Sequence, residues 1–130
     1  MPLLPLTPDQ KGEKGARDVI AAWAQGLEQG DYGQAWAQYR RGTDPTRAAF
    51  TKWWQRYRDM KVSIGAGEMD AGAGSLFYTA PITITGKTAD GKPFRLEGPI
   101  NLRRVNDVDG ATADQLRWHI GNTDLKTVSS

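Results

Sequence analysis

The chain has 130 residues, a length that suits one compact domain built around a single core and excludes two full domains. Hydrophobic residues make up 38% of it and a further 15 residues are glycines, an apolar share that excludes intrinsic disorder of the whole chain. The 17 basic residues against 15 acidic ones give a net charge of +2, which lacks the dense positive field of a nucleic-acid-binding domain.

Three prolines and an absence of apolar periodicity predict that residues 1–15 form a flexible tether. The following residues, 16–128, are predicted to form a single domain. Its first element is a helix from Ala16 to Gly30, where the glycine suits the left-handed backbone that commonly ends a helix. The apolar residues of this helix share one face: Val19, Ile20, Trp23 and Leu27.

Two further helices are expected. Asp31 is a suitable N-cap for a short helix that ends at residues 40–42, where two arginines favour the negative helix end. Asp44 and Pro45 predict the start of the third helix, because an aspartate can cap it and a proline suits the first helical position. Four aromatic residues follow at the spacing of one helical face: Phe50, Trp53, Trp54 and Tyr57.

Beyond Asp59 the apolar residues alternate, which predicts four strands that each have one apolar face. The strands are expected around residues 62–64, 76–84, 94–102 and 116–120. Asp90-Gly91 predicts a hairpin turn between the second and third strands, and residues 107–110 predict one between the third and fourth. The run of small residues from Gly65 to Gly74 is expected to hold a bulge or a loose loop.

A helical layer followed by a one-sided antiparallel sheet defines an α+β domain. The sheet has to bury its apolar face against the helices, because nothing else in the chain is available to cover it. We therefore predict three N-terminal helices packed on an antiparallel meander of four strands or more.

This order of elements resembles the nuclear transport factor 2-like superfamily, which includes ketosteroid isomerase and the polyketide cyclases. The resemblance covers Ala16–Leu125, and the segments that carry it are Gly30–Tyr32, Phe50–Trp54, Ile82–Gly86 and Leu116–Ile120. It implies a curved sheet wrapped around the helices as a cone, with a pocket at the mouth. Because the use of that pocket varies widely in the superfamily, the fold does not define the function.

The sequence is also similar to small bacterial envelope proteins of this fold, in which the domain follows a proline-rich tether behind a lipoprotein signal. The chain shows no signal segment and no cysteine for lipidation, so either Met1 has replaced the natural start or the protein is cytoplasmic. The resemblance favours the periplasm-facing envelope. It also implies a homodimer through the outer face of the sheet.

Enzymes that resemble ketosteroid isomerase place a base on the sheet face that lines the cone, since an apolar wall shifts pKa values and excludes water. The inward positions of the predicted strands, from Val62 to Asn122, include no carboxylate. The single histidine, His119, is the catalytic candidate, although alternation places it on the outer face unless a bulge at a glycine such as Gly121 turns it inward. Asp31, borne on a helix, is the other group that an enzyme could use.

The aromatic side chains of the helices either pack in the core or line a pocket for an apolar or sugar-like ligand. The residues expected at such a site are Tyr39, Trp54, Tyr57 and Tyr78. No glycine loop opens a helix, so no nucleotide cofactor is expected. No cysteine and one histidine exclude thiolate and multi-histidine metal sites, and no metal site is predicted. Three aspartates lack the late glutamate of a calcium loop and are interpreted as turn residues: Asp107, Asp109 and Asp114.

Residues 40–61 contain seven basic residues against Asp44 and Asp59. A solvated helix face, weak contact with an anionic lipid surface and single-strand nucleic-acid binding are all compatible with this charge. The aromatic residues between the basic ones have the spacing of a buried stripe, so no specific nucleic-acid partner is expected. No apolar run is long enough for a transmembrane segment.

The function favoured by these patterns is non-catalytic binding of a small ligand or a protein partner by a cone-shaped domain. The main support is that the inward face offers no base. The alternative is a small-molecule isomerase, cyclase or hydrolase that uses the cone pocket.

Overall fold

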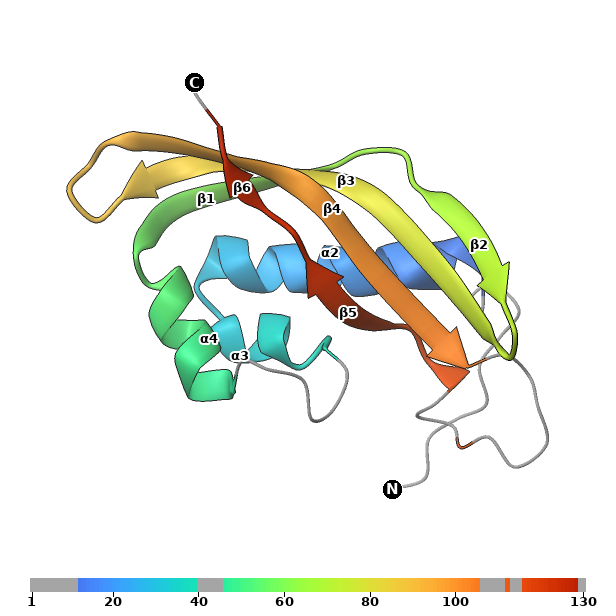
Figure 1. Ribbon diagram of the computed structural model, residues 1–130. Coiled ribbons are helices and arrows are strands. Elements are labelled where there is room, and N and C mark those ends of the chain that lie inside the picture. The colour runs from blue at the N-terminus through green and yellow to red at the C-terminus, as the bar shows by residue number, and fades with distance from the viewer. Residues whose placement is uncertain (1–11, 40–45, 106–111, 113–115, 129–130) are drawn as a thin grey trace.

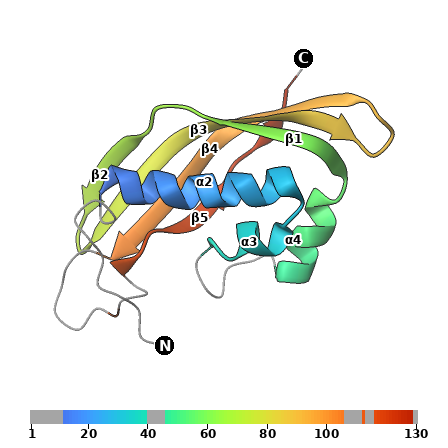
Figure 2. The same ribbon diagram turned by 180° about the vertical axis from the view of Figure 1, so that it is seen from behind.

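The computed structural model describes residues 12–39, 46–105, 112 and 116–128. The described helices are α2 (Glu13–Gln29), α3 (Tyr32–Trp36) and α4 (Arg47–Trp54). The described strands are β1 (Tyr57–Ile64), β2 (Glu68–Gly72), β3 (Ser75–Thr88), β4 (Pro93–Val105), β5 (His119–Thr123) and β6 (Lys126–Thr127). The sheet curves over α2, while α3 and α4 lie together at one end of it (Figures 1 and 2). The predicted α+β architecture is thus confirmed.

The six strands form one antiparallel sheet in the order β1-β3-β4-β5. β2 pairs with β3 at the opposite end from β1, and β6 likewise pairs with β4 beyond β5. The long pair β3–β4 is closed by a turn at Asp90-Gly91, as predicted, and Gly91 has the left-handed φ of 85° that this turn needs. The meander is confirmed for the described strands; residues 107–110, the other predicted turn, lie outside the described residues.

The helices begin and end close to their capping residues. α2 starts at Glu13, so the last residues assigned to the tether belong to the helix, and Gly30 ends it with a φ of 76°. Asp31 caps α3 by accepting a hydrogen bond from the Gln34 N–H at 3.1 Å. α3 ends at Trp36, earlier than predicted, and the predicted end at residues 40–42 lies outside the described residues.

Two features of the third helix differ from the prediction. Thr46 is the N-cap of α4, with its hydroxyl accepting from the Ala49 N–H at 3.3 Å, while Asp44 and Pro45 lie outside the described residues. Tyr57 is the first residue of β1, although its spacing continues the helical period. The chain leaves the helix at Trp54, so the prediction that Tyr57 is helical was wrong.

The strand predictions need two corrections. The run from Gly65 to Gly74 contains β2, whose five residues are all exposed and so give no alternating pattern. The last predicted strand, 116–120, begins later, since β5 starts at His119 and continues to Thr123. Its register with β4 shifts at Gly121, because Asn101 pairs with Asn122 whereas Leu102 pairs with Ile120.

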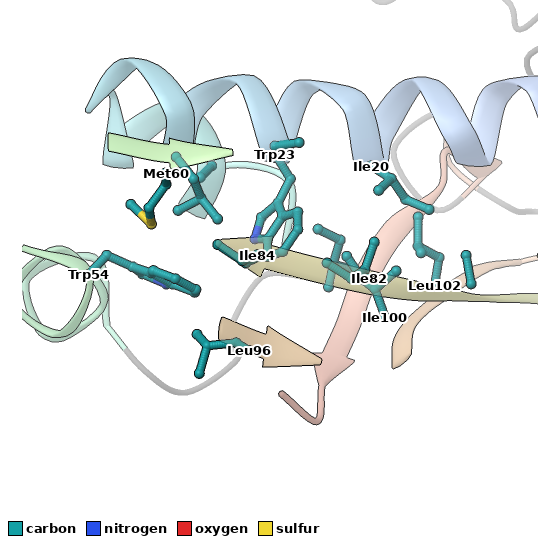
Figure 3. Close-up of a cluster of buried hydrophobic side chains, with 14 of the residues drawn as sticks. Ile20, Trp23, Trp54, Met60, Ile82, Ile84, Leu96, Ile100 and Leu102 are labelled. Atoms are coloured by element: carbon teal, nitrogen blue, oxygen red, sulfur yellow. The ribbon is translucent and has the colours of Figure 1, made fainter. Parts of the chain in front are cut away.

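The core lies between α2 and the concave face of the sheet (Figure 3). Trp23 is fully buried there and points from α2 toward the isoleucines of β3. Trp54 and Met60 close one end of this cluster. Burial of this apolar surface, at roughly 25 cal/mol per Å², is the main favourable term that holds the helices on the sheet. None of the described helices is long and apolar enough to span a membrane.

Candidate functional site

A pocket of about 320 Å³ lies between α4, the segment that follows α3, and the C-terminal part of the chain. We call it the α4 pocket. Among the described residues, its lining consists of Tyr39, Phe50, Trp53, Trp54, Gly121, Asn122, Thr123 and Leu125. Four of these residues are aromatic, and none of the eight carries a formal charge at neutral pH. The pocket is therefore an apolar site with a few neutral polar groups.

The aromatic wall of the pocket is set by the helical spacing of α4, which places Phe50 and Trp54 on the same buried face. Phe50 packs against Tyr39 with ring centroids 5.5 Å apart, and Trp54 packs against Trp53 at 4.7 Å. Trp54 also meets the buried Trp23 edge-on at 6.4 Å, which joins this wall to the core. The wall is consequently a packed array of rings, held from behind by α2.

The opposite wall is made by β5 and the chain beyond it. The shift at Gly121 lets Thr123 pair with the buried Ile100. The Thr123 side chain therefore lies on the inward face of the sheet, whereas the Asn122 side chain does not. The chain then crosses β4 at Gly98, where an added Cβ would overlap the carbonyl oxygen of Asp124 and lie 3.1 Å from Leu125 Cα. The glycine thereby lets Leu125 reach the pocket.

Tyr39 provides one of the two hydroxyl groups among the described lining residues. Its backbone forms a parallel bridge with Ile120, next to a hydrogen bond of 2.8 Å from the Ile120 N–H to the Gln38 carbonyl. Burial raises the pKa of the Tyr39 hydroxyl, and interactions with the side chains of Trp23 and Thr123 partly offset the rise. The indole N–H of Trp23 is buried, and no acceptor among the described residues lies at normal hydrogen-bond distance and angle from it. Its interaction with the Tyr39 hydroxyl is therefore not a regular hydrogen bond. Tyr39 is therefore a neutral hydrogen-bonding group at neutral pH.

The raised pKa of Tyr39 gives a prediction for alkaline pH. A group whose pKa is higher in the folded state contributes stability that is complete below its ordinary value of 10.0 and is lost as the pH rises through the folded value. We expect the free energy of unfolding to fall above this pH, and to fall less steeply in the Tyr39→Phe variant. Urea unfolding of both proteins across the alkaline range measures the difference. Parallel slopes would contradict the assignment to Tyr39.

The structure brings together two of the four predicted ligand-binding residues, Tyr39 and Trp54, in the α4 pocket. Tyr57 lies beside this wall, with its ring 4.3 Å from that of Phe94, and does not line the pocket. Tyr78 is fully buried beside the first turns of α2 and does not line the pocket. Its hydroxyl donates to the Glu13 carboxylate at 2.9 Å and accepts from Arg17 at 3.0 Å, a polar network that ties α2 to the sheet.

His119 and Asp31 are both outside the lining of the α4 pocket. His119 pairs with Arg103 of β4 and precedes the shift at Gly121 in the chain. The bulge therefore turns Thr123 inward but leaves the His119 side chain on the outer face of the sheet. Asp31 is exposed and serves as the cap of α3. No group of three possible metal ligands occurs among the described residues, which do not include Asp107, Asp109 or Asp114.

Sequence reasoning missed the residues of the C-terminal wall: Gly121, Asn122, Thr123 and Leu125 as a set. The sequence did contain one signal, because Gly121 was among the glycines at which a bulge could reverse the alternation. Asn122, counted as inward from strict alternation, pairs instead with the outward-facing Asn101. Leu125 gave no signal, since its place depends on the crossing at Gly98.

Comparison with solved structures identifies the fold. A candidate dehydratase of the nuclear transport factor 2-like family from Streptomyces avermitilis matches with a TM-score of 0.62 at 12% identity, covering 95% of this chain and 100% of that one. The protein Aln2 from a Streptomyces species matches with a TM-score of 0.59 at 13% identity, over 95% and 94% of the two chains. A candidate calcium/calmodulin-dependent protein kinase II association domain from Xanthomonas campestris matches with 0.60 at 14% identity, over 98% and 97%.

No protein-family model matches the sequence, and no curated protein matches it either. The identities to the solved structures are low, so the likeness concerns the fold alone. The chain has the nuclear transport factor 2-like fold, as the sequence resemblance implied.

Proposed function

We propose that the protein binds a small, neutral and largely apolar molecule in the α4 pocket and performs no chemistry on it. The observation that supports this proposal is a lining that, over the described part of the chain, is aromatic and holds no charged group. A charged ligand would lose its hydration on entry and find no ion to pair with among these residues, which is costly in an apolar site. A neutral ring system would gain the full contact with Trp54, Phe50 and their neighbours.

The dimensions and polar groups of the pocket narrow the ligand class further. A volume of about 320 Å³ is at the lower end of the range for small-molecule sites, which fits a compact one- or two-ring compound. The Tyr39 hydroxyl and Thr123 interact with each other in the lining and can bond one polar atom of such a ligand. The proposed ligand is thus a flat apolar compound with a hydroxyl or carbonyl group.

Calorimetric titration with 1-naphthol and 1-naphthoate tests the proposal, because the two share a ring system and differ in charge. We expect saturable binding of naphthol and at least about tenfold weaker binding of naphthoate, the cost of leaving a carboxylate unpaired. Tyr39→Phe should weaken naphthol binding by about two- to tenfold through the loss of one hydrogen bond. Tyr57→Phe is the matched control and should have no effect, since Tyr57 does not line the pocket. Equal affinities for the two compounds would contradict a site for neutral ligands.

An isomerase, cyclase or hydrolase using the same pocket is the second candidate. The observation in its favour is Tyr39, a buried neutral hydroxyl that could donate to a developing negative charge. Such chemistry also needs a base, and the lining residues that the structure describes include neither a carboxylate nor a histidine. Binding without catalysis therefore has the better support.

The homodimer implied by the resemblance would use the outer face of the sheet. On this face the Thr79 hydroxyl donates to the Asn101 side chain at 2.9 Å, and Arg95 pairs with Glu97 at 2.7 Å. These groups already satisfy one another, and Phe77 is the large apolar side chain most exposed on this face. The homodimer stays a prediction.

A further inference from the structure

The segment from Arg47 to Lys61, which includes α4 and the start of β1 at the end of the molecule where the α4 pocket lies, carries five exposed basic residues. We call this group the basic patch, and its members are Arg47, Lys52, Arg56, Arg58 and Lys61. None of them lies within ion-pair distance of a carboxylate among the described residues, in contrast to Lys14, Lys92 and Arg95. Asp59 is the one acidic residue within this stretch of sequence, and the Glu28 carboxylate of α2 reaches β1 next to it, accepting from the Val62 N–H at 2.9 Å. Five cations against these two carboxylates leave the patch with an excess of positive charge.

Trp53 stands within the basic patch and is 41% exposed. The Arg56 guanidinium lies over its ring, 4.6 Å from the centroid, and the Arg56 Nε–H donates to the Trp53 carbonyl at 3.2 Å. A second nitrogen of Arg56 donates to the Tyr57 hydroxyl at 3.3 Å. These contacts hold a large aromatic side chain at the surface beside a cation, the pairing of residues found where proteins meet a lipid interface.

The opposite end of the molecule carries charges of both signs. There the exposed strand β2 carries Glu68 and Asp70, and the first turns of α2 hold Glu13 and Asp18 beside Lys14 and Arg17. Figures 1 and 2 show β2 and the start of α2 together at the end of the sheet away from α4. An anionic surface would therefore attract the end with α4 more strongly than the opposite end, which favours a single orientation.

We propose that the basic patch docks on a bilayer containing anionic phospholipids, with Trp53 placed at the headgroup level. The charge of the patch is complementary to such a surface, and Trp53 supplies the apolar contact that charge alone lacks. A single-stranded nucleic acid fits less well, because it needs several exposed rings for stacking. The other rings of α4 are buried, with Phe50 and Trp54 only 3% and 4% exposed.

Co-sedimentation of the full chain with lipid vesicles tests the charge requirement. We expect binding to phosphatidylcholine vesicles that contain one third phosphatidylglycerol, little binding to pure phosphatidylcholine, and release by high salt. Lys52→Glu should weaken binding by about 20-fold or more, since each cation near an anionic membrane contributes about a fivefold factor and this change reverses one. Lys14→Glu is the matched control: it makes the same change in net charge in the first turn of α2, at the end of the molecule away from α4, and should weaken binding by less than about threefold.

Fluorescence tests the position of Trp53. Brominated lipid should quench part of the tryptophan emission of the bound protein, and the Trp53→Phe variant should lose this quenching. Equal effects of Lys52→Glu and Lys14→Glu would overturn the proposal, as would equal binding to both kinds of vesicle or unchanged quenching in Trp53→Phe. Tighter binding to a single-stranded oligonucleotide than to anionic vesicles would also overturn it. These readouts do not involve naphthol, so they are independent of the ligand proposed for the pocket.

Discussion

Replacing Trp23 with alanine should lower the free energy of unfolding by about 3 to 5 kcal/mol, the range for removing a fully buried large side chain. Trp23 has no exposed surface and lies between α2 and the concave face of the sheet (Figure 3). It also supports the pocket wall through its edge-on contact with Trp54. The cavity left by alanine would thus remove contacts from both the core and the wall. Urea unfolding followed by circular dichroism gives the value.

Two variants make this result interpretable. Trp53→Ala is the matched control on an exposed tryptophan and should cost about 1 kcal/mol, the worth of its ring contacts. Trp23→Phe should fold if Trp23→Ala does not, and we expect it to cost about 1 to 2 kcal/mol because it removes volume but no hydrogen bond of ordinary geometry. Equal losses for Trp23→Ala and Trp53→Ala would contradict the central place of Trp23 in the core.

The elements with strong periodicity were predictable from the sequence. The apolar stripe of α2 and its terminal glycine predicted the helix, and the alternation from Tyr78 to Ile84 predicted the buried face of β3. These predictions are confirmed because the apolar residues of a periodic pattern are the ones that the element buries. Strand β2 has no buried face, so its sequence shows no alternation of apolar and polar residues. It is defined as a strand only by its pairing with β3.

Tyr57 shows a different limit. The aromatic residues from Phe50 to Tyr57 keep helical spacing, but the helix ends at Trp54 and Asp59 takes a left-handed φ of 52° soon after. Tyr57 still packs on the same aromatic cluster from its place in β1. Side-chain spacing reports which residues meet in the core, whereas the path of the backbone between them depends on local geometry that spacing does not encode.

The aromatic wall of the candidate site could be predicted from the sequence in part, but the facing wall could not. Tyr39 and Trp54 belong to the aromatic set of the helices, so composition and spacing indicated them. The facing wall depends on a bulge and on a backbone crossing, both of which use glycines whose roles are set by distant parts of the chain. Without the register of β5 on β4, Thr123 and Leu125 could not be assigned to the pocket.

Replacing Gly98 with alanine should disturb the pocket without a change of charge or polarity. The added Cβ would overlap the Asp124 carbonyl oxygen and lie 2.7 Å from the carbonyl carbon. These are backbone atoms of the neighbouring segment, so relief requires that segment to move away from β4. The hydrogen bond of 3.1 Å from the Asp124 N–H to the Pro99 carbonyl and the pairing of β6 would then be strained or lost.

We expect Gly98→Ala to lower the free energy of unfolding by about 1 to 3 kcal/mol, the cost typical of forcing an extra carbon into a packed site. Naphthol binding should fall with it, because Leu125 follows directly after Asp124 and lines the pocket. Gly121→Ala is the matched control for stability alone, because Gly121 itself lines the pocket. Its Cβ would meet only the Asn101 carbonyl oxygen at 3.6 Å, an ordinary contact, and should change stability by less than about 0.5 kcal/mol. Urea unfolding of both variants and calorimetry on Gly98→Ala test the prediction. A Gly98→Ala protein that unfolds and binds like the parent would show that the crossing at Gly98 does not shape the pocket.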